Sequence, residues 1–219
     1  MLIDICARRA VDYDVSSDLL YSGSYDQTIK VLFLCSCYGH IPSLTASSPQ
    51  VWDVKTQACR RTLRGHSGWI SAVALLQNAG DSGVGSPMLA SASWDSTIRL
   101  WRVGGGADEM GDAADALDQG YRVMTAGQGN ALYCVGVGDG GRIINVGCRH
   151  RQIQRWDIER GACVSTLLGH GKEVQAIDTS NDIIVSGSGD GTAKLWDALT
   201  DSCSVTLCGH TDSVMAVQV

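Results

Sequence analysis

The stretch that decides the fold is "LLGHGKEVQAIDTSNDIIVSGSGDGTAKLWD", Leu167–Asp197. It begins near a Gly-His pair and ends in a Trp-Asp pair, and between them short apolar runs alternate with Gly, Asp, Asn and Ser. Apolar and polar residues in alternation, interrupted by turn-forming residues, are typical of short antiparallel strands joined by tight turns. The stretch is therefore predicted to form strands.

Parts of this stretch recur along the chain. Three segments contain a Cys seven residues before the His of a Gly-His pair: "ACRRTLRGHSGWISAV", "ACVSTLLGHGKEVQAI" and "SCSVTLCGHTDSVMAV". In two others, "SASWDSTIRLW" and "SGSGDGTAKLW", the Trp is the sixth residue after the Asp. A Gly-His and a Trp-Asp that recur about every 40 residues or more predict repeated units of four strands.

The sequence resembles the WD-repeat family, and the motifs "LRGH", "LLGH", "LCGH", "VWDV", "RWDI" and "LWDA" carry the likeness over nearly the whole chain. The resemblance implies an all-β fold, a β-propeller of antiparallel four-stranded blades, with about four blades and the first strand of a fifth in these residues. The expected division is blade one at 1–64 with an insertion at 31–50, blade two at 65–126 with loops at 76–87 and 103–121, blade three at 127–168, blade four at 169–208, and the start of blade five at 209–219. Because the last blade is incomplete, the chain is expected to be a fragment or truncated gene model of a longer propeller.

In this family a His, a Ser, an Asp and a Trp of one blade can form a hydrogen-bonded chain, which satisfies polar groups that the fold buries. The expected sets are His66, Ser91, Asp95 and Trp101, and His170, Ser186, Asp190 and Trp196. Ser93 and Ser188 lie on the same strand faces and are alternatives to the two serines. A hydrolase triad would use similar residue types, but repetition in each blade favours a structural role. No catalytic or cofactor-binding residue is predicted.

Blade three departs from the pattern. When Trp156 is aligned with Trp196, His150 stands in place of the Asp, and Gln128 stands in place of the His. This blade is expected to form by strand pairing and to be the least stable of the four.

The first unit contains twenty additional residues. Asp26 and Trp52 are 26 residues apart, and deleting Val31–Gln50 restores the normal spacing. The insertion is expected to split the third strand immediately before Trp52. Its codon properties and whole number of triplets support the hypothesis of a retained or wrongly assigned intron. The alternatives are an extruded loop and a metal site at Cys35, Cys37 and His40, which would supply only three ligands of poor spacing.

Composition limits the classes of partner. The net charge of −6 argues against a nucleic-acid partner, because Lys and Arg supply most of that affinity. The longest apolar run, "VLFLC", is too short to span a membrane, and the start "MLIDICARRAVDYD" does not resemble a signal peptide. An intracellular protein is predicted, cytoplasmic rather than nuclear, with no membrane partner.

The nine cysteines are expected to be reduced thiols. Cys59, Cys163 and Cys203 recur at one strand position and are interpreted as small packed hydrophobes rather than metal ligands. No metal site and no cofactor is predicted.

The resemblance implies a non-catalytic scaffold that binds other proteins or peptides on a propeller face. Residues that the repeat does not explain are the candidate partner-binding residues: Tyr25, Trp69, Trp94, Arg149 and Glu173. The alternative role for the two tryptophans is to cap loose blade edges. One version of the scaffold is the substrate-recruiting part of a ubiquitin ligase or of another multiprotein complex, and the alternative is an accessory propeller of a larger enzyme or motor. Open blade edges are expected to favour self-association of the isolated fragment.

Overall fold

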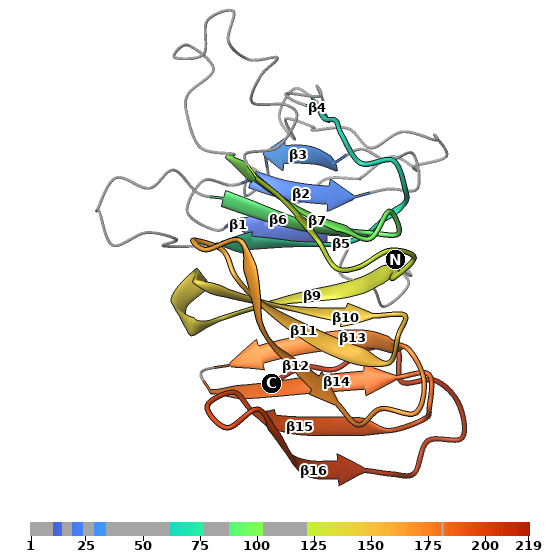
Figure 1. The fold of residues 1–219 in the computed structure, drawn as a ribbon. Coiled ribbons are helices and arrows are strands. Elements are labelled where there is room, and N and C mark those ends of the chain that lie inside the picture. Colours follow the sequence, from blue (N-terminus) through green and yellow to red (C-terminus); the bar gives the residue numbers. More distant parts are fainter. Residues whose placement is uncertain are drawn as a thin grey trace, which may run out of the picture.

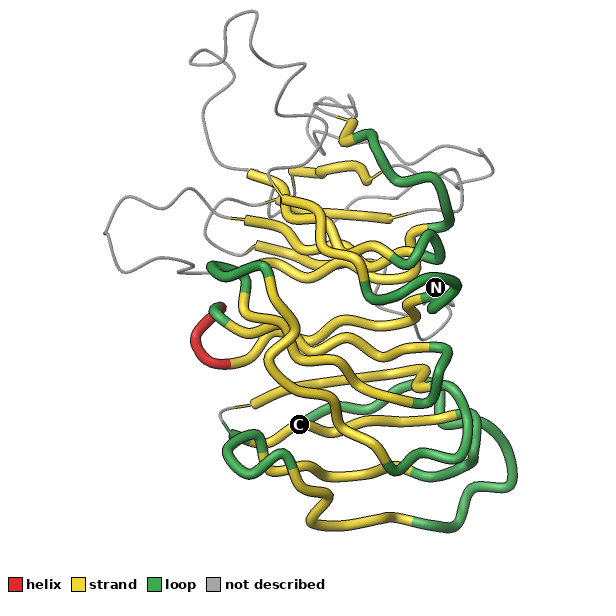
Figure 2. The backbone as a smooth tube through the Cα atoms, in the orientation of Figure 1, coloured by secondary structure: helices red, strands yellow, loops and turns green. Residues whose placement is uncertain are grey.

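The structure is a computed structural model that describes residues 11–14, 19–23, 29–33, 62–76, 88–102, 122–180 and 182–219. These residues form sixteen strands and one short 3-10 helix, η1 (Asp139–Gly141). Figure 2 shows the strands in yellow and the helical turn in red. The prediction of an all-β chain of four-stranded antiparallel blades is confirmed.

The strands form four antiparallel sheets, and within each sheet the strands neighbour one another in chain order. Sheet one contains β1 (Val11–Asp14), β2 (Leu19–Gly23), β3 (Ile29–Phe33) and β4 (Thr62–Leu63). Sheet two contains β5 (Ile70–Leu76), β6 (Met88–Ser93), β7 (Thr97–Arg102) and β8 (Arg122–Thr125). Sheet three contains β9 (Leu132–Gly138), β10 (Ile143–Cys148), β11 (Gln152–Asp157) and β12 (Ala162–Leu168). Sheet four contains β13 (Val174–Ser180), β14 (Ile183–Ser188), β15 (Ala193–Asp197) and β16 (Ser202–Leu207).

The four sheets follow one another through the molecule in chain order (Figure 1). The first strand of each sheet contacts the first strand of the next, so that β5 lies against β1 and β9, and β9 lies against β13. Every residue of β5 is buried, whereas every residue of β16 is exposed. The first strands therefore form the interior of the assembly, and the hydrophobic core fills the spaces between successive sheets.

Two glycines allow the sheets to approach closely. A Cβ on Gly147 would collide with the Cys134 Sγ atom and would lie 2.9 Å from Val174 Cγ1. A Cβ on Gly187 would lie 2.7 Å from Val214 Cγ1. Each glycine is the fifth residue of the second strand of its sheet, and each faces a valine that follows the Gly-His turn of the next unit. These contacts fix how near one unit can pack against the next.

Sheet one differs from the expectation in its third strand. β3 continues past Lys30 through the inserted residues Val31, Leu32 and Phe33, so the strand is not broken at Val31. Leu32 pairs with Leu20, which is the register that Trp101 has with Leu89 and Trp196 with Ile184. In sheet one this register is therefore taken by Leu32, which belongs to an apolar β-forming run. Residues 34–50 and Trp52 itself lie outside the described residues.

The C-terminal segment also differs from its expected form. Residues 209–219 are described, but none of them belongs to a strand. The segment is bonded to sheet four at two separate places. The Val214 N–H donates to the Ser188 carbonyl at 2.9 Å, and the Val219 N–H donates to Asp178 Oδ2 at 3.0 Å. A strand needs a ladder of hydrogen bonds with a neighbouring strand, and two isolated bonds do not provide one.

Candidate functional site

Sheet two contains a continuous chain of four side chains. The Trp101 Nε1–H donates to Ser91 Oγ at 2.8 Å, Ser91 Oγ lies 2.7 Å from His66 Nε2, and His66 Nδ1 lies 2.8 Å from Asp95 Oδ2. The distances are satisfied together when Ser91 donates to Nε2 and His66 donates its Nδ1 proton to the carboxylate. Through these hydrogen bonds, His66 in the Gly-His turn before β5 is connected to Ser91 in β6, to Asp95 in the β6–β7 turn and, through Ser91, to Trp101 in β7.

Sheet four repeats the arrangement. The Trp196 Nε1–H donates to Ser186 Oγ at 2.8 Å, and His170 lies 2.7 Å from Ser186 Oγ and 3.0 Å from Asp190 Oδ2. The alternative serines, Ser93 and Ser188, instead accept a hydrogen bond from the backbone N–H of Asp95 and Asp190. The structure therefore brings together the side chains of both sets and gives the two serines of each second strand different partners.

Electrostatics keep the two sets in one protonation state. Burial lowers the pKa of His66 and His170, and this effect is larger than the increase that the neighbouring aspartates cause. Both imidazoles are therefore neutral at neutral pH. Burial alone would raise the pKa of Asp95, but hydrogen bonds from His66, Thr97 and the Ser67 backbone hold it below its ordinary value. Ser91 is fully buried beneath Trp101. A serine that no substrate can reach does not act as a nucleophile. The hydrogen-bonded set thus has the role of connecting strands and turns, and not that of a hydrolase catalytic triad.

Sheet three has a different set of polar contacts. Gln128 and His150 are both exposed, and Val146 stands where Ser91 and Ser186 stand in the other sheets. The Trp156 Nε1–H donates to Gln154 Oε1 at 3.3 Å, and Gln154 Nε2 donates to the Ala126 carbonyl at 3.2 Å. Gln154 lies two residues before Trp156, on the same strand face. This spacing is the signal from which the hydrogen bond between the two side chains could have been predicted.

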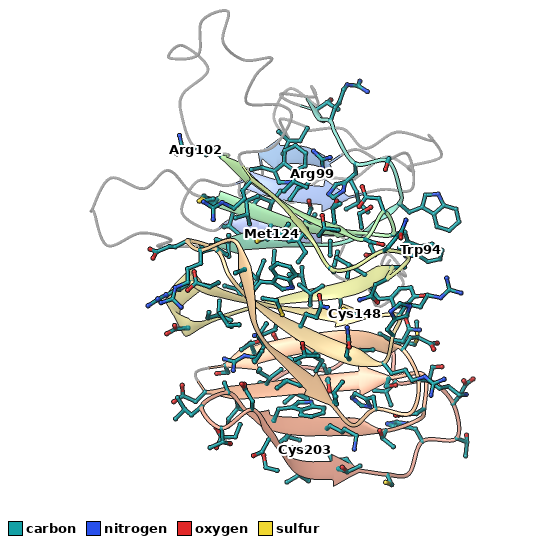
Figure 3. The ribbon with its side chains drawn as sticks, viewed as in Figure 1. Trp94, Arg99, Arg102, Met124, Cys148 and Cys203 are labelled. Carbon is teal, nitrogen blue, oxygen red and sulfur yellow. The ribbon has the colours of Figure 1, made fainter. Side chains whose placement is uncertain are left out.

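An aromatic cluster lies at the turns that begin β5 and β7, and consists of Trp69, Trp94 and Tyr133. The two tryptophan rings have centroids 4.6 Å apart and remain 44% and 37% exposed, respectively. The Trp94 N–H donates to the Trp69 carbonyl at 2.9 Å, and the rings of Trp94 and of Tyr133 from sheet three are nearly perpendicular, at 85°, with their centroids 5.6 Å apart. Gly68 permits this approach, because a Cβ there would lie 2.6 Å from the Asp95 backbone nitrogen. Figure 3 shows Trp94 at the edge of the molecule where these turns lie.

The remaining candidate residues occupy matching turns of other sheets. Arg149 is exposed in the β10–β11 turn, and its N–H donates to the Ala131 carbonyl as Trp94 donates to Trp69. Glu173 is half-buried before β13, where its carboxylate accepts a bond from Gln175 Nε2 at 3.0 Å. Tyr25 lies outside the described residues. Tyr133 was not among the predicted residues, and only the packing of sheet three against sheet two shows its place in the cluster.

The thiols differ from the interpretation given to them. Cys163 and Cys203 are exposed, so the view that both are packed hydrophobes is wrong. Both lie on a fourth strand, the outermost strand of its sheet, where side chains reach solvent. Cys59, like Cys35, Cys37 and His40, lies outside the described residues. In the part of the chain that the structure covers, no group of three or more His, Cys, Asp or Glu side chains is arranged to hold a metal ion, and no helix has the length and apolarity to cross a bilayer.

At the opposite ends of the strands lies an open hollow of about 530 Å³. Its walls are the end of β5, the end of β9 with η1, and Asp182 in the β13–β14 turn. Two carboxylates, of Asp139 and Asp182, reach it, but no other described feature of the hollow points to a ligand. The aromatic cluster on the other face is the more developed candidate surface.

Comparison with known proteins identifies the repeats. The family model "WD domain, G-beta repeat" matches residues 7–31, 57–102 and 161–197. The first three strands of sheet three fall between the matched segments, in agreement with its altered polar set.

Several curated proteins are similar to this chain. Nuclear distribution protein PAC1-2 of Uncinocarpus reesii is 30% identical over 139 residues, which are 58% of this chain and 28% of the relative. Autophagy-related protein 16 of Arabidopsis thaliana is 27% identical over 184 residues, 80% of this chain and 32% of the relative. The probable coatomer subunit beta' of Schizosaccharomyces pombe is 29% identical over 140 residues, 63% of this chain and 15% of the relative. The chain thus spans about a third or less of the length of these relatives.

Proposed function

Since the chain belongs to the WD-repeat family, we propose that it is a non-catalytic scaffold that binds other proteins or peptides through the face carrying the aromatic cluster. The observation that carries the proposal is the solvent-exposed pair Trp69 and Trp94, whose rings lie with their centroids 4.6 Å apart at a tilt of 43°. Large aromatic side chains cost free energy when left in water, and tryptophan is enriched among the residues that dominate binding interfaces. The His and Ser side chains that could perform chemistry in sheets two and four are instead held in structural ties.

The names of the relatives support a role within larger assemblies, since they refer to nuclear distribution, autophagy and a coatomer. A narrower form of the proposal is the substrate-recruiting part of a ubiquitin ligase. The alternative is an accessory propeller of a larger enzyme or motor protein. Mass spectrometry of the purified complex distinguishes the two, because ligase subunits would co-purify in the first case and a covalently linked catalytic domain would appear in the second. A cytoplasmic location is part of the proposal, and fluorescence imaging of the tagged protein tests it.

The experiment is to replace both tryptophans, Trp69→Ala and Trp94→Ala, and to compare the proteins captured by the tagged chain from its own cells. The matched control is Leu199→Ala, which removes a side chain that is 77% exposed on the turn after β15. The double variant is expected to lose specific partners with a melting temperature close to that of the wild type, while the control retains them. Retention of every partner by the double variant, or loss of partners together with a large fall in melting temperature, would contradict the proposal.

A further inference from the structure

The β10–β11 turn of sheet three has an unusual residue at its left-handed position. Arg151 has a φ of 66°, and the residues at the matching position of sheets two and four are Ser96 at 69° and Gly191 at 79°. Glycine adopts this conformation without the steric cost that a Cβ introduces. A long cationic side chain placed where glycine would suffice suggests that the guanidinium itself has a use.

Arg151 belongs to a basic turn, defined here as Arg149–Arg151, in which all three residues are exposed. Among the residues that the structure describes, neither Arg149 nor Arg151 forms an ion pair, whereas Arg142, Arg155 and Arg160 each pair with an aspartate. Two guanidiniums in one short turn are a local concentration of positive charge on a chain whose net charge is −6.

The basic turn is joined to the aromatic cluster. The Arg149 N–H donates to the Ala131 carbonyl at 2.8 Å, and Ala131 is two residues before Tyr133. Tyr133 in turn packs its ring against Trp94 at 5.6 Å. The rings and the guanidiniums therefore stand on neighbouring turns of sheets two and three, at the same ends of their strands. The matching turn of sheet four has Gly189 and Gly191 in place of the large side chains.

Resting on the function proposed above, we propose that the aromatic cluster and the basic turn form one binding site for an acidic peptide segment of another protein. An apolar side chain of the peptide packs on Trp69 and Trp94, and its neighbouring carboxylates accept hydrogen bonds from Arg149 and Arg151. Arginine presents a planar fork of donors that suits a carboxylate. The two guanidiniums repel a basic peptide, so the charge selects the acidic partner.

The test uses fluorescein-labelled peptides and fluorescence anisotropy on the complete chain. The probe is Gly-Glu-Glu-Leu-Glu-Glu-Gly, and the two comparison peptides replace the glutamates with lysines or the leucine with alanine. The Glu peptide is expected to bind at least about tenfold more tightly than the Lys peptide, since hydrogen bonds between charged groups contribute on this scale. Its affinity is expected to fall as the salt concentration is raised from about 0.05 to about 0.5 M, because salt screens the attraction between the carboxylates and the guanidiniums.

The protein variant is Arg149→Ala with Arg151→Gly, in which glycine suits the left-handed position and preserves the turn. It is expected to bind the Glu peptide at least about tenfold more weakly, with an unchanged melting temperature. The matched control, Arg160→Ala, removes an exposed guanidinium from the turn between β11 and β12, at the opposite ends of the strands, and is expected to bind as the wild type does.

Equal binding of the Glu and Lys peptides, or unchanged binding by the arginine variant, overturns the inference. If natural partners are lost from the Trp69→Ala, Trp94→Ala variant while the arginine variant keeps them, the scaffold proposal stands and the acidic-peptide site does not. If the tryptophan variant keeps every natural partner, the scaffold proposal fails at this surface. The scaffold proposal and the acidic-peptide proposal are therefore contradicted by different experimental results.

Discussion

Sheets two and three have the same strand order and equivalent strand registers, but they hold their third-strand tryptophan in different ways. In sheet two, Trp101 is fully buried and ends a chain of side chains that reaches across three elements to Asp95. In sheet three, Trp156 bonds only two residues back, to Gln154. The comparison teaches that such a sheet forms without the His-Ser-Asp set, because in sheet three other side-chain bonds join the sheet to the turn before β9. Asn130 Oδ1 accepts the His150 N–H at 3.2 Å, and Gln154 Nε2 donates to the Ala126 carbonyl.

The largest effect is expected from Trp101→Ala. The change removes a large buried side chain and leaves Ser91 without its donor, so the free energy of unfolding should fall by about 3–5 kcal/mol. Urea denaturation measures this loss. Trp156→Ala, in the sheet without the set, should cost less, and an equal or greater loss there would remove the distinction between the two sheets.

A smaller effect is expected from Asp95→Ala. The variant removes the carboxylate that accepts from the His66 Nδ1–H, the Ser67 N–H and the Thr97 hydroxyl, at a cost of about 1–3 kcal/mol. His150→Ala is the matched control, because His150 stands at the same position of sheet three and is exposed; its cost should be below about 0.5 kcal/mol. Denaturant unfolding measures both losses of free energy. Similar losses for the two variants would show that this turn position contributes equally to the stability of sheets two and three.

Amide exchange compares the sheets without mutation. Backbone N–H groups of β10 and β11 are expected to exchange about tenfold faster than those of β14 and β15, a difference of about 1.4 kcal/mol in opening free energy. The reason is that the turn before β9 is not tied to its sheet by a His-Asp bond. Hydrogen exchange read by mass spectrometry checks this, and slowest exchange in sheet three would refute the expectation that it is the least stable.

The smallest expected effect is the dependence of folding stability on pH. Burial lowers the pKa of His66 and His170, so below about pH 6.5 the unfolded chain takes up protons that the folded chain does not, and stability falls with falling pH. Burial opposes the lowering at Asp95 and Asp190, but the hydrogen bonds to their carboxylates prevail. Their contribution is present above about pH 3.8 and is lost as pH falls below it.

Thermal melts from pH 7.5 to 3 measure this dependence. Replacement of both histidines, His66→Gln and His170→Gln, is expected to flatten the upper part of the curve, between pH 7.5 and 5. An unchanged slope in that interval would assign the dependence to other groups.

The sequence predicted the features that depend on fixed spacing. The interval of six positions from Asp95 to Trp101 equals that from Asp190 to Trp196, and a repeated unit has one geometry. It did not predict that Leu32 would take the tryptophan register of sheet one, because several apolar residues suit one strand position. The Tyr133 contact with Trp94 joins two sheets, and the exposure of Cys163 depends on which strand is outermost; neither is a property of local sequence.

The close approach at Gly147 and Gly187 has a consequence for curvature. Each of these positions contributes only a hydrogen atom to the space between two sheets, while sheet two has the methyl group of Ala92 at the matching strand position. The size of the side chain at this position of each repeat thus limits how closely one unit can approach the next. Enlarging Gly147 to alanine would push a Cβ into the Cys134 sulfur and the Val174 side chain, and would force sheets three and four apart at this point.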